Sequence, residues 1–280
     1  MQLLKRESQY LRGNKLSLIL IKTGTKLSLL KKRGIILQSN TYSEADALIT
    51  LLSDDGFKEK FLIKGIKKSK KRPIVASEIG TLIHIDYYFH QNNSLFYLVK
   101  EISLEKRYDV IKNNYLSTLI LCLFLELIEK TLPEGYADPK HFKLLFGALE
   151  ALEKYGSNIL ILPFFKFKLL LSLGVVPREY NCQKCGDGIL TKDSAKLNLA
   201  TLEALCCDCE VFSENDIEII RLFKGISKKS YDSVVLEKIP EVLLMRADTI
   251  LDMFIKSSLG VSPKSSEMLY RSLHELNAII

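Results

Sequence analysis

The sequence predicts an α+β protein in which a small N-terminal β-barrel or sandwich is followed by an all-helical region with an inserted four-cysteine module. Three observations support this prediction. Apolar and polar residues alternate between residues 34 and 108, as they do in half-buried strands. From residue 109 onward, apolar residues recur every three or four positions, which is the helical period. Two pairs of cysteines interrupt this helical pattern between Cys182 and Cys209.

The chain is long enough for about two ordinary domains and apolar enough to build a core in each. It has 280 residues, of which 47% are hydrophobic and 26% are charged. No segment reaches the roughly 18 consecutive apolar residues of a membrane span. The apolar run 16–21 is short and no small-residue cleavage site follows it, so the sequence shows no clear secretory signal. We therefore expect a cytoplasmic protein.

Residues 1–33 form a basic N-terminal extension in this prediction. Nine of them are Lys or Arg, and the one acidic residue is Glu7. The net charge of the whole chain is +7, so the residues that follow are close to neutral. The extension could be a basic arm, a targeting segment or a translated stretch before the true start. The overall charge indicates an anionic partner only weakly.

Residues 34–108 predict five short strands, the number expected for a small barrel or sandwich. The triplet Asp54-Asp55-Gly56 is typical of a tight turn between two of them. A five-stranded barrel of this size fits an OB-fold, although strand spacing alone does not select that topology. The predicted strands are 34–39, 47–53, 57–64, 81–89 and a last one that begins at residue 95.

Residues 109–280 predict helices with broad apolar stripes. A helix over 116–128 ends at the Leu132-Pro133-Glu134-Gly135 segment, and Pro139 is suited to the first turn of the next helix. The Ser213–Asp216 segment is typical of an N-cap. Further helices are expected over 139–152, 159–173, 217–223 and 241–258.

Two cysteine pairs predict a structural zinc site. Each pair encloses two residues, and twenty residues separate the pairs, which is the spacing expected when four thiolates surround one tetrahedral zinc ion. Four thiolates leave no position for a water molecule, so the site is interpreted as structural. Free buried cysteines or redox-active pairs are the alternatives, and Cys207 could replace Cys206. The expected ligands, in a module of about 178–212, are Cys182, Cys185, Cys206 and Cys209.

A basic loop predicts contacts with nucleic acid. Six positive charges fall within the nine residues 64–72, with no acidic residue among them. Such a loop between barrel strands can follow a phosphate backbone, although it could also be a solvated surface. Some aromatic residues on the nearby strands 81–89 and 95–99 could stack on bases, but most are expected in the core. The expected DNA-binding residues are Lys64, Lys67, Lys68, Lys70, Lys71 and Arg72.

The sequence has none of the common enzymatic motifs that we sought. It contains no Gly-rich phosphate-binding loop and no G-x-S-x-G motif, and its four histidines are scattered. We therefore expect no catalytic residues. Three other classes of protein stay open: a zinc-dependent nuclease or hydrolase, a zinc-ribbon RNA-binding protein, and a structural adaptor. The nuclease would need an open metal site and a general base, and the sequence offers neither.

Several short motifs follow one another along residues 34–270, and their order and spacing resemble the RecO family of bacterial DNA repair proteins. No single motif decides the resemblance. The motifs are Gly34–Leu37, Tyr42-Ser-Glu44-Ala-Asp46, Leu51-Leu52, Lys64-Gly65, Leu132-Pro133-Glu134, Asp138-Pro139, Phe165–Leu170, Leu173-Gly174, Pro177, Cys182-x-x-Cys185-Gly186, Leu259-Gly260 and Pro263-Lys264-Ser265.

The resemblance implies an N-terminal OB-fold over 34–108 and a helical domain over 109–280 with a zinc module. It also implies a non-enzymatic recombination mediator that binds single- and double-stranded DNA and anneals complementary strands. The implied partners are RecR and single-stranded DNA-binding protein, with RecA loading as the outcome. The sequence departs from the family in three places: the basic extension, Ser266-Glu267 where the family often has basic residues, and Cys207 within the second pair.

Overall fold

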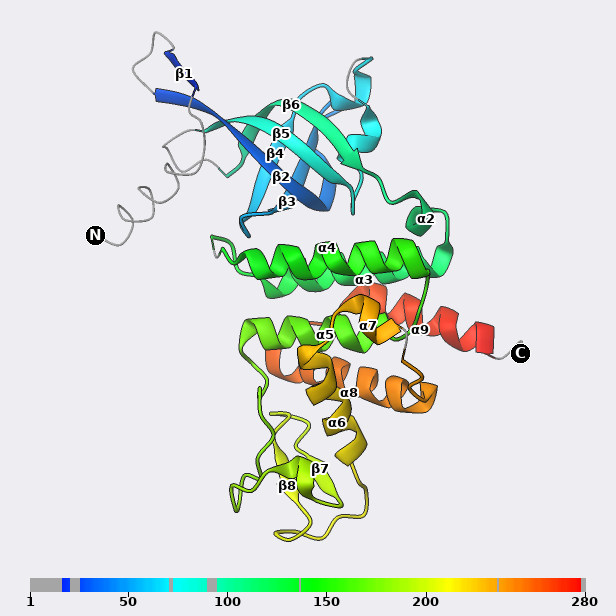
Figure 1. Ribbon diagram of the computed structural model, residues 1–280. Helices are drawn as coiled ribbons and strands as arrows, with labels where there is room; N and C mark the ends of the chain where they lie inside the picture. The colour runs from blue at the N-terminus through cyan, green and yellow to red at the C-terminus, as the bar shows by residue number, and fades with distance from the viewer. Residues whose placement is uncertain are drawn as a thin grey trace. The chain divides into compact units, whose positions relative to one another are not determined.

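The computed structural model describes residues 17–20, 26–70, 73–89, 95–135, 137–235 and 237–277, which form two compact units (Figure 1). The first unit contains the described residues up to Tyr108 together with Leu132–Phe142. The second unit contains Asp109–Thr131 and the described residues from Lys143 onward. Among the described residues, every helix is too short or too polar to cross a membrane.

The first unit is a closed, OB-like barrel of five strands, as the sequence predicted. Neighbouring strands pair antiparallel except for β4 and β6, which pair in parallel, and pairing of β2 with β5 closes the ring. A further strand, β1 (Ser17–Leu20), pairs with the beginning of β2. The barrel strands are β2 (Lys26–Thr41), β3 (Ala47–Ser53), β4 (Lys58–Ile63), β5 (Leu82–Phe89) and β6 (Tyr97–Lys106). Two 3₁₀ turns, η1 (Ile66–Lys68) and η2 (Ile74–Ser77), lie between β4 and β5.

The first predicted strand was too short, because consecutive basic residues hide its beginning. Strand β2 starts at Lys26 rather than Gly34. Lys32 is buried in this strand, where its ammonium group pairs with Glu59. Arg33 donates two hydrogen bonds of 2.8 Å to the Glu105 carboxylate. The end of the basic extension is therefore part of the barrel, and its charges are neutralised by partners that are distant in the sequence.

The apolar faces of the five strands enclose a single core. Phe61 and Tyr87 meet edge to face in it, with their ring centroids 5.0 Å apart. The alternation read from the sequence is reproduced, since His84 is exposed between the buried Ile83 and Ile85. The core cluster also contains Leu30, Ile36, Ala47, Ile49, Leu51, Ile63, Ile66, Ala76, Val99 and Ile102.

Residues Leu132–Phe142 also belong to the barrel unit, although they follow the first long helix in the sequence. The buried ammonium group of Lys58 donates a hydrogen bond to the carbonyl oxygen of Leu132. Gly56 confirms the predicted turn, with a φ of +90°. A Cβ atom at this position would lie 2.3 Å from the carbonyl carbon of Asp138, so the close approach of the two segments requires glycine.

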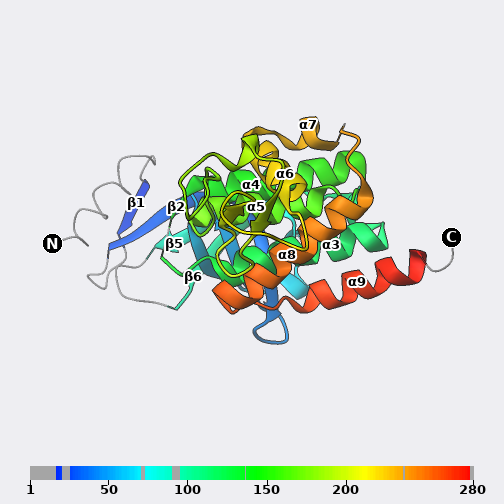
Figure 2. The same ribbon diagram turned by 90° about the horizontal axis from the view of Figure 1, so that it is seen from below.

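The second unit is helical except for the cysteine module. Helix α9 packs against α3, and α8 packs against α5 (Figures 1 and 2). The predicted helices are present, but α9 was missed, since Leu269 is the one apolar residue among its described buried side chains and the others, Ser265 and Ser272, are polar. The helices are α2 (Asp109–Lys112), α3 (Tyr115–Thr131), α4 (Pro139–Tyr155, whose first residues belong to the barrel unit), α5 (Ile161–Leu173), α6 (Ile217–Lys228), α7 (Tyr231–Val235), α8 (Glu241–Leu259) and α9 (Lys264–Asn277).

Helix α9 begins at a carboxylate supplied by α3. The Glu126 carboxylate accepts hydrogen bonds of 3.0 Å from the backbone amides of Lys264 and Ser265. It also accepts one of 2.6 Å from the Ser265 hydroxyl. Burial alone would raise the pKa of Glu126, but hydrogen bonds from Lys130, Ser265 and Lys264 lower it to about 2. The Pro263-Lys264-Ser265 motif therefore forms a helix start that depends on an ionised side chain elsewhere in the unit.

Candidate metal centre and nucleic-acid interface

The structure brings the four predicted cysteines together in one cluster. The sulfur atoms of Cys182, Cys185, Cys206 and Cys209 all lie within 4.8 Å of one another. The sulfurs of Cys185 and Cys206 are 3.7 Å apart, although Cys185 belongs to the first pair and Cys206 to the second. Cys182 and Cys206 are buried, whereas Cys185 is exposed. These four thiols could therefore hold a metal ion near the surface of the module.

Backbone geometry builds each half of this cluster. Gly186 follows the first pair with a φ of +79°, and its amide donates a 2.8 Å hydrogen bond to the Cys182 carbonyl. This positive φ favours a residue without Cβ at the turn. The second pair is formed by the end of the short hairpin β7 (Ala195–Leu197) and β8 (Ala204–Cys206). In this hairpin Cys206 lies on strand β8, while Cys209 follows in a turn.

Electrostatic interactions within the cluster favour the thiolate form of Cys182 and disfavour that of Cys209. Hydrogen bonds from the backbone amides of Cys185, Cys206 and Lys184 lower the pKa of Cys182 to about 6. The neighbouring sulfurs of Cys185 and Cys206 raise the pKa of Cys209 to about 12. Negative charge therefore accumulates with each deprotonation, and a cation at the centre is the group that would offset it.

Cys207, the alternative ligand, lies outside the four-cysteine cluster. Its thiol is 3.8 Å from the carboxylate of the adjacent Asp208. That carboxylate is also bound by Lys192, whose ammonium group lies 2.6 Å from Asp208 and 2.9 Å from Asp187. Because Asp187 follows the first cysteine pair and Asp208 lies within the second, Lys192 links the two halves of the cluster. Cys206, and not Cys207, is therefore part of the cluster that could hold a metal ion.

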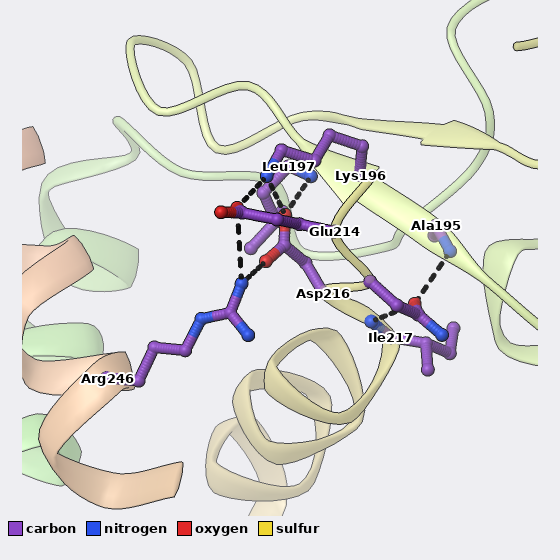
Figure 3. Close-up of polar contacts among 8 residues, drawn as sticks. Ala195, Lys196, Leu197, Glu214, Asp216, Ile217 and Arg246 are labelled. Carbon is purple, nitrogen blue, oxygen red and sulfur yellow. Dashed lines mark hydrogen bonds and ion pairs between the residues drawn. The ribbon is translucent and has the colours of Figure 1, made fainter. Parts of the chain in front are cut away.

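A buried aspartate fixes the cysteine module to the helices of its unit (Figure 3). One oxygen of Asp216 accepts a 3.0 Å hydrogen bond from the backbone amide of Leu197 in β7. The other accepts a 2.5 Å hydrogen bond from Arg246 in α8. Lys196 lies 3.4 Å from the same carboxylate and 2.7 Å from Glu214. Asp216 is 1% exposed, so these partners supply the charge compensation that its burial requires.

The Ser213–Asp216 segment directly precedes α6, as the sequence predicted. Asp216 precedes the helix, but its side chain makes no capping hydrogen bond. The side-chain oxygen of Asn215, in the same segment, accepts hydrogen bonds of 3.0 Å from the backbone amide of Ile217 and 3.1 Å from that of Ala195. The polar segment therefore serves tertiary contacts as well as the helix start, and sequence pattern alone could not separate the two roles.

The basic loop lies between β4 and β5, beside the β2–β3 connection. The Lys67 ammonium group donates a 2.7 Å hydrogen bond to the hydroxyl of Thr41. Lys68 forms an exposed ion pair of 3.2 Å with Glu44. Lys64 and Lys70 are exposed. Lys71 and Arg72 lie outside the described residues.

A carboxylate anchors the beginning of this loop. Gly65 adopts a φ of +69°, and its amide donates a 2.7 Å hydrogen bond to Asp46. This hydrogen bond and a second one with Ser43 lower the pKa of Asp46. The amide of Lys67 also donates a 3.1 Å hydrogen bond to the Ala45 carbonyl. The basic loop is therefore held against the β2–β3 connection while its lysine side chains extend outward.

Most of the aromatic residues singled out in the sequence belong to the barrel core or pack on it. Tyr87 is 1% exposed, and Phe89 and Tyr97 pack against the core cluster. Phe96 is half-buried and contacts Tyr42, which is more exposed than any of them. The sequence analysis did not single out Tyr42 for base stacking, and its place in the Tyr42–Asp46 motif is the signal that could have drawn attention to it.

Two family descriptions match nearly all of the described chain. "Recombination protein O N terminal" matches residues 27–106, and "Recombination protein O C terminal" matches residues 112–267. The first match begins one residue after the start of β2. Together the two matches span nearly all of the five barrel strands, helices α3 to α8 and the four-cysteine cluster.

Curated relatives point to the same family. The chain is 35% identical over 250 residues to the DNA repair protein RecO of Leptospira biflexa serovar Patoc, which covers 89% of this chain and all of that protein. It is 28% identical over 181 residues to the RecO protein of Syntrophomonas wolfei, covering 64% of this chain and 70% of the relative. It is 24% identical over 243 residues to the RecO protein of Caldanaerobacter subterraneus, covering 85% and 96%.

Proposed function

The chain belongs to the RecO family of DNA repair proteins, which are recombination mediators and not enzymes, and from this premise we propose that it binds single- and double-stranded DNA and anneals complementary strands. The observation that supports this most strongly is the match of both family descriptions in their expected order. Strand annealing needs two strands held close together and no hydrolysis. The absence of a phosphate-binding Gly-rich loop from the sequence agrees with an activity independent of ATP.

We assign the DNA contacts of the barrel unit to the basic loop. Its residues are Lys64, Lys67, Lys68, Lys70, Lys71 and Arg72, four of which the structure describes. The described lysines are exposed and project from a loop that hydrogen bonds hold in place. Lysine side chains of this kind bind phosphates as point charges, so their contacts give affinity without sequence preference.

The proposed metal is a structural Zn²⁺ bound by Cys182, Cys185, Cys206 and Cys209. Sulfurs at about 2.3 Å from a tetrahedral zinc ion lie about 3.8 Å from one another. The 3.7 Å separation of the Cys185 and Cys206 sulfurs agrees with this value. When bound, the ion would join the two cysteine pairs and stabilise the fold of the module. Its chemistry is structural, because four thiolates leave no open position.

The same feature argues against a zinc-dependent nuclease, which needs a metal-bound water and a general base. A zinc-ribbon RNA-binding protein is the stronger alternative, since phosphate contacts do not separate RNA from DNA. RecR and single-stranded DNA-binding protein are the proposed protein partners, with RecA loading as the outcome. The proposed location is the bacterial cytoplasm, at the nucleoid.

Annealing of two labelled complementary strands tests this function. Without ATP, the purified protein should accelerate annealing well above the spontaneous rate, measured by fluorescence energy transfer between the strands. Binding to single-stranded DNA, duplex DNA and RNA should be compared at one salt concentration, because such affinities depend on salt. A protein that binds RNA but neither form of DNA, or that binds DNA without accelerating annealing, would contradict the proposal.

A further inference from the structure

An aromatic pair with one exposed ring lies outside the barrel core. Tyr42 lies in the β2–β3 connection and is 53% exposed. Phe96 lies directly before β6 and is half-buried. Its neighbour Leu95 is 89% exposed. Neither ring belongs to the cluster of side chains that fills the barrel, so core packing does not explain the pair.

The two rings hold each other in a defined orientation. Their centroids are 5.6 Å apart, and their planes are inclined by 69°, which is an edge-to-face contact. In such a contact Phe96 can cover at most one face of the Tyr42 ring. The exposure of Tyr42 is consistent with an open second face, which is the surface that a planar ligand needs for stacking.

The basic loop lies immediately beside this open ring. Lys67 is hydrogen bonded to Thr41, the residue before Tyr42. Lys68 pairs with Glu44, two residues after Tyr42. Both side chains of the Lys68–Glu44 pair are largely exposed, so a phosphate can replace the carboxylate at little cost. A single ligand can therefore place a phosphate on the lysines and a planar group on the ring.

We infer that Tyr42, supported by Phe96, stacks on an unpaired base of a DNA strand whose phosphates contact Lys67 and Lys68. This inference rests on the proposed DNA binding and adds to it a means of selecting single strands. In a duplex each base face is covered by its neighbours, whereas an unpaired base can turn onto an aromatic side chain. Backbone contacts by lysine do not make this distinction, because both forms of DNA carry the same phosphate.

Affinity measurements with three probes test the inference in the full chain. The probes are a homothymidine strand, an abasic strand of equal length and charge, and a hairpin-closed duplex. Tyr42→Ala should lower the affinity for the homothymidine strand about tenfold. Its affinities for the abasic strand and for the duplex should stay within twofold of the wild-type values, because those probes present no free base. The variant should therefore lose most of its preference for single strands.

Two variants serve as matched controls. Tyr42→Phe keeps the ring and should bind all three probes like the wild type. Leu95→Ala removes a neighbouring exposed apolar side chain without removing a ring, and should also bind normally. Circular dichroism and thermal unfolding establish that each variant is folded, and Tyr42→Leu replaces Tyr42→Ala if the latter does not fold. Equal losses on the homothymidine and abasic strands, or no loss on either, would overturn the inference. A wild-type protein that binds no probe would instead refute the proposed DNA binding.

Discussion

Replacing Lys67, Lys68 and Lys70 by Ala together should reduce the salt dependence of DNA binding by a predictable amount. Each lysine that neutralises a phosphate releases condensed counterions, and on single strands this contributes about −0.7 to the slope of log affinity against log salt concentration. Three such contacts correspond to a slope that is flatter by about 2. The loss of affinity should be the same for unrelated sequences, because phosphate contacts read no bases.

The Lys68–Glu44 ion pair makes this prediction more specific. A phosphate that binds Lys68 must displace the Glu44 carboxylate, which then remains close to another negative charge. Lys68→Ala alone should therefore lower the affinity for DNA less than Lys70→Ala does. The side chain of Lys70 is exposed. Glu44→Gln should raise the affinity about two- to fivefold at low salt, the scale of an exposed ion pair, and this gain should fade as salt rises.

Fluorescence anisotropy with one labelled strand at several salt concentrations gives both the affinity of each variant for DNA and the slope of that affinity against salt. The basic extension is the competing source of charge, but removal of residues 1–33 would delete part of β2, including the buried Lys32. The control is therefore replacement of Lys5, Arg6, Arg12 and Lys15 by Gln in the same background. An unchanged slope in the triple Ala variant that also lacks these four charges would show that the loop does not touch phosphate.

Three further predictions concern the second unit. Cys182→Ser and Cys206→Ser should lose the bound metal, whereas Cys207→Ser should keep it. The metal content is measured after purification without chelator. If Cys207→Ser lost the metal and Cys206→Ser kept it, Cys207 would be the third ligand. Asp216→Ala should destabilise the junction of the cysteine module by about 1–3 kcal/mol, because it leaves the buried Leu197 amide unsatisfied. Hydrogen exchange of the Leu197 amide should become faster. Unchanged exchange would refute the stabilising role of Asp216. Glu126 has a lowered pKa, so its contribution to stability is complete above about pH 4.5 and is lost as pH falls toward 2. Glu126→Gln should therefore be less stable than the wild type at pH 7 and should lose less stability over that acid range, as followed by thermal unfolding.

The sequence predicted the elements whose patterns are local. Alternation located the barrel strands, and the helical period located α3, α4, α5, α6 and α8. The spacing of the two cysteine pairs predicted the four-cysteine cluster that could hold a metal ion, although Cys207 stayed open as an alternative to Cys206. In these cases one side of an element faces a core, or one turn places two ligands together, so the signal lies within a few residues.

The features that depend on distant partners could not be predicted in this way. The first half of β2 resembled a basic arm because Glu59 and Glu105, which neutralise Lys32 and Arg33, are far away in the sequence. Helix α9 has one apolar residue, Leu269, among its described buried side chains, and its start is stabilised by Glu126 from α3. Such pairings arise only in the folded chain, where burial and charge compensation decide them.

The route of the chain between the two units bears on how the protein is made. The barrel strands end at Lys106, but Lys58 and Phe57 also pair with Leu132 and Ala137 in the returning segment. At a synthesis rate of about 5–20 residues per second, residue 142 follows residue 108 by about 2–7 s. During this interval the nascent barrel lacks the segment Leu132–Phe142, and the rest of the second unit, to which α2 and α3 belong, has not yet been synthesised. A gene fragment that stops at residue 108 should therefore yield an incomplete barrel, and one that ends after residue 142 would add two helices without their partners.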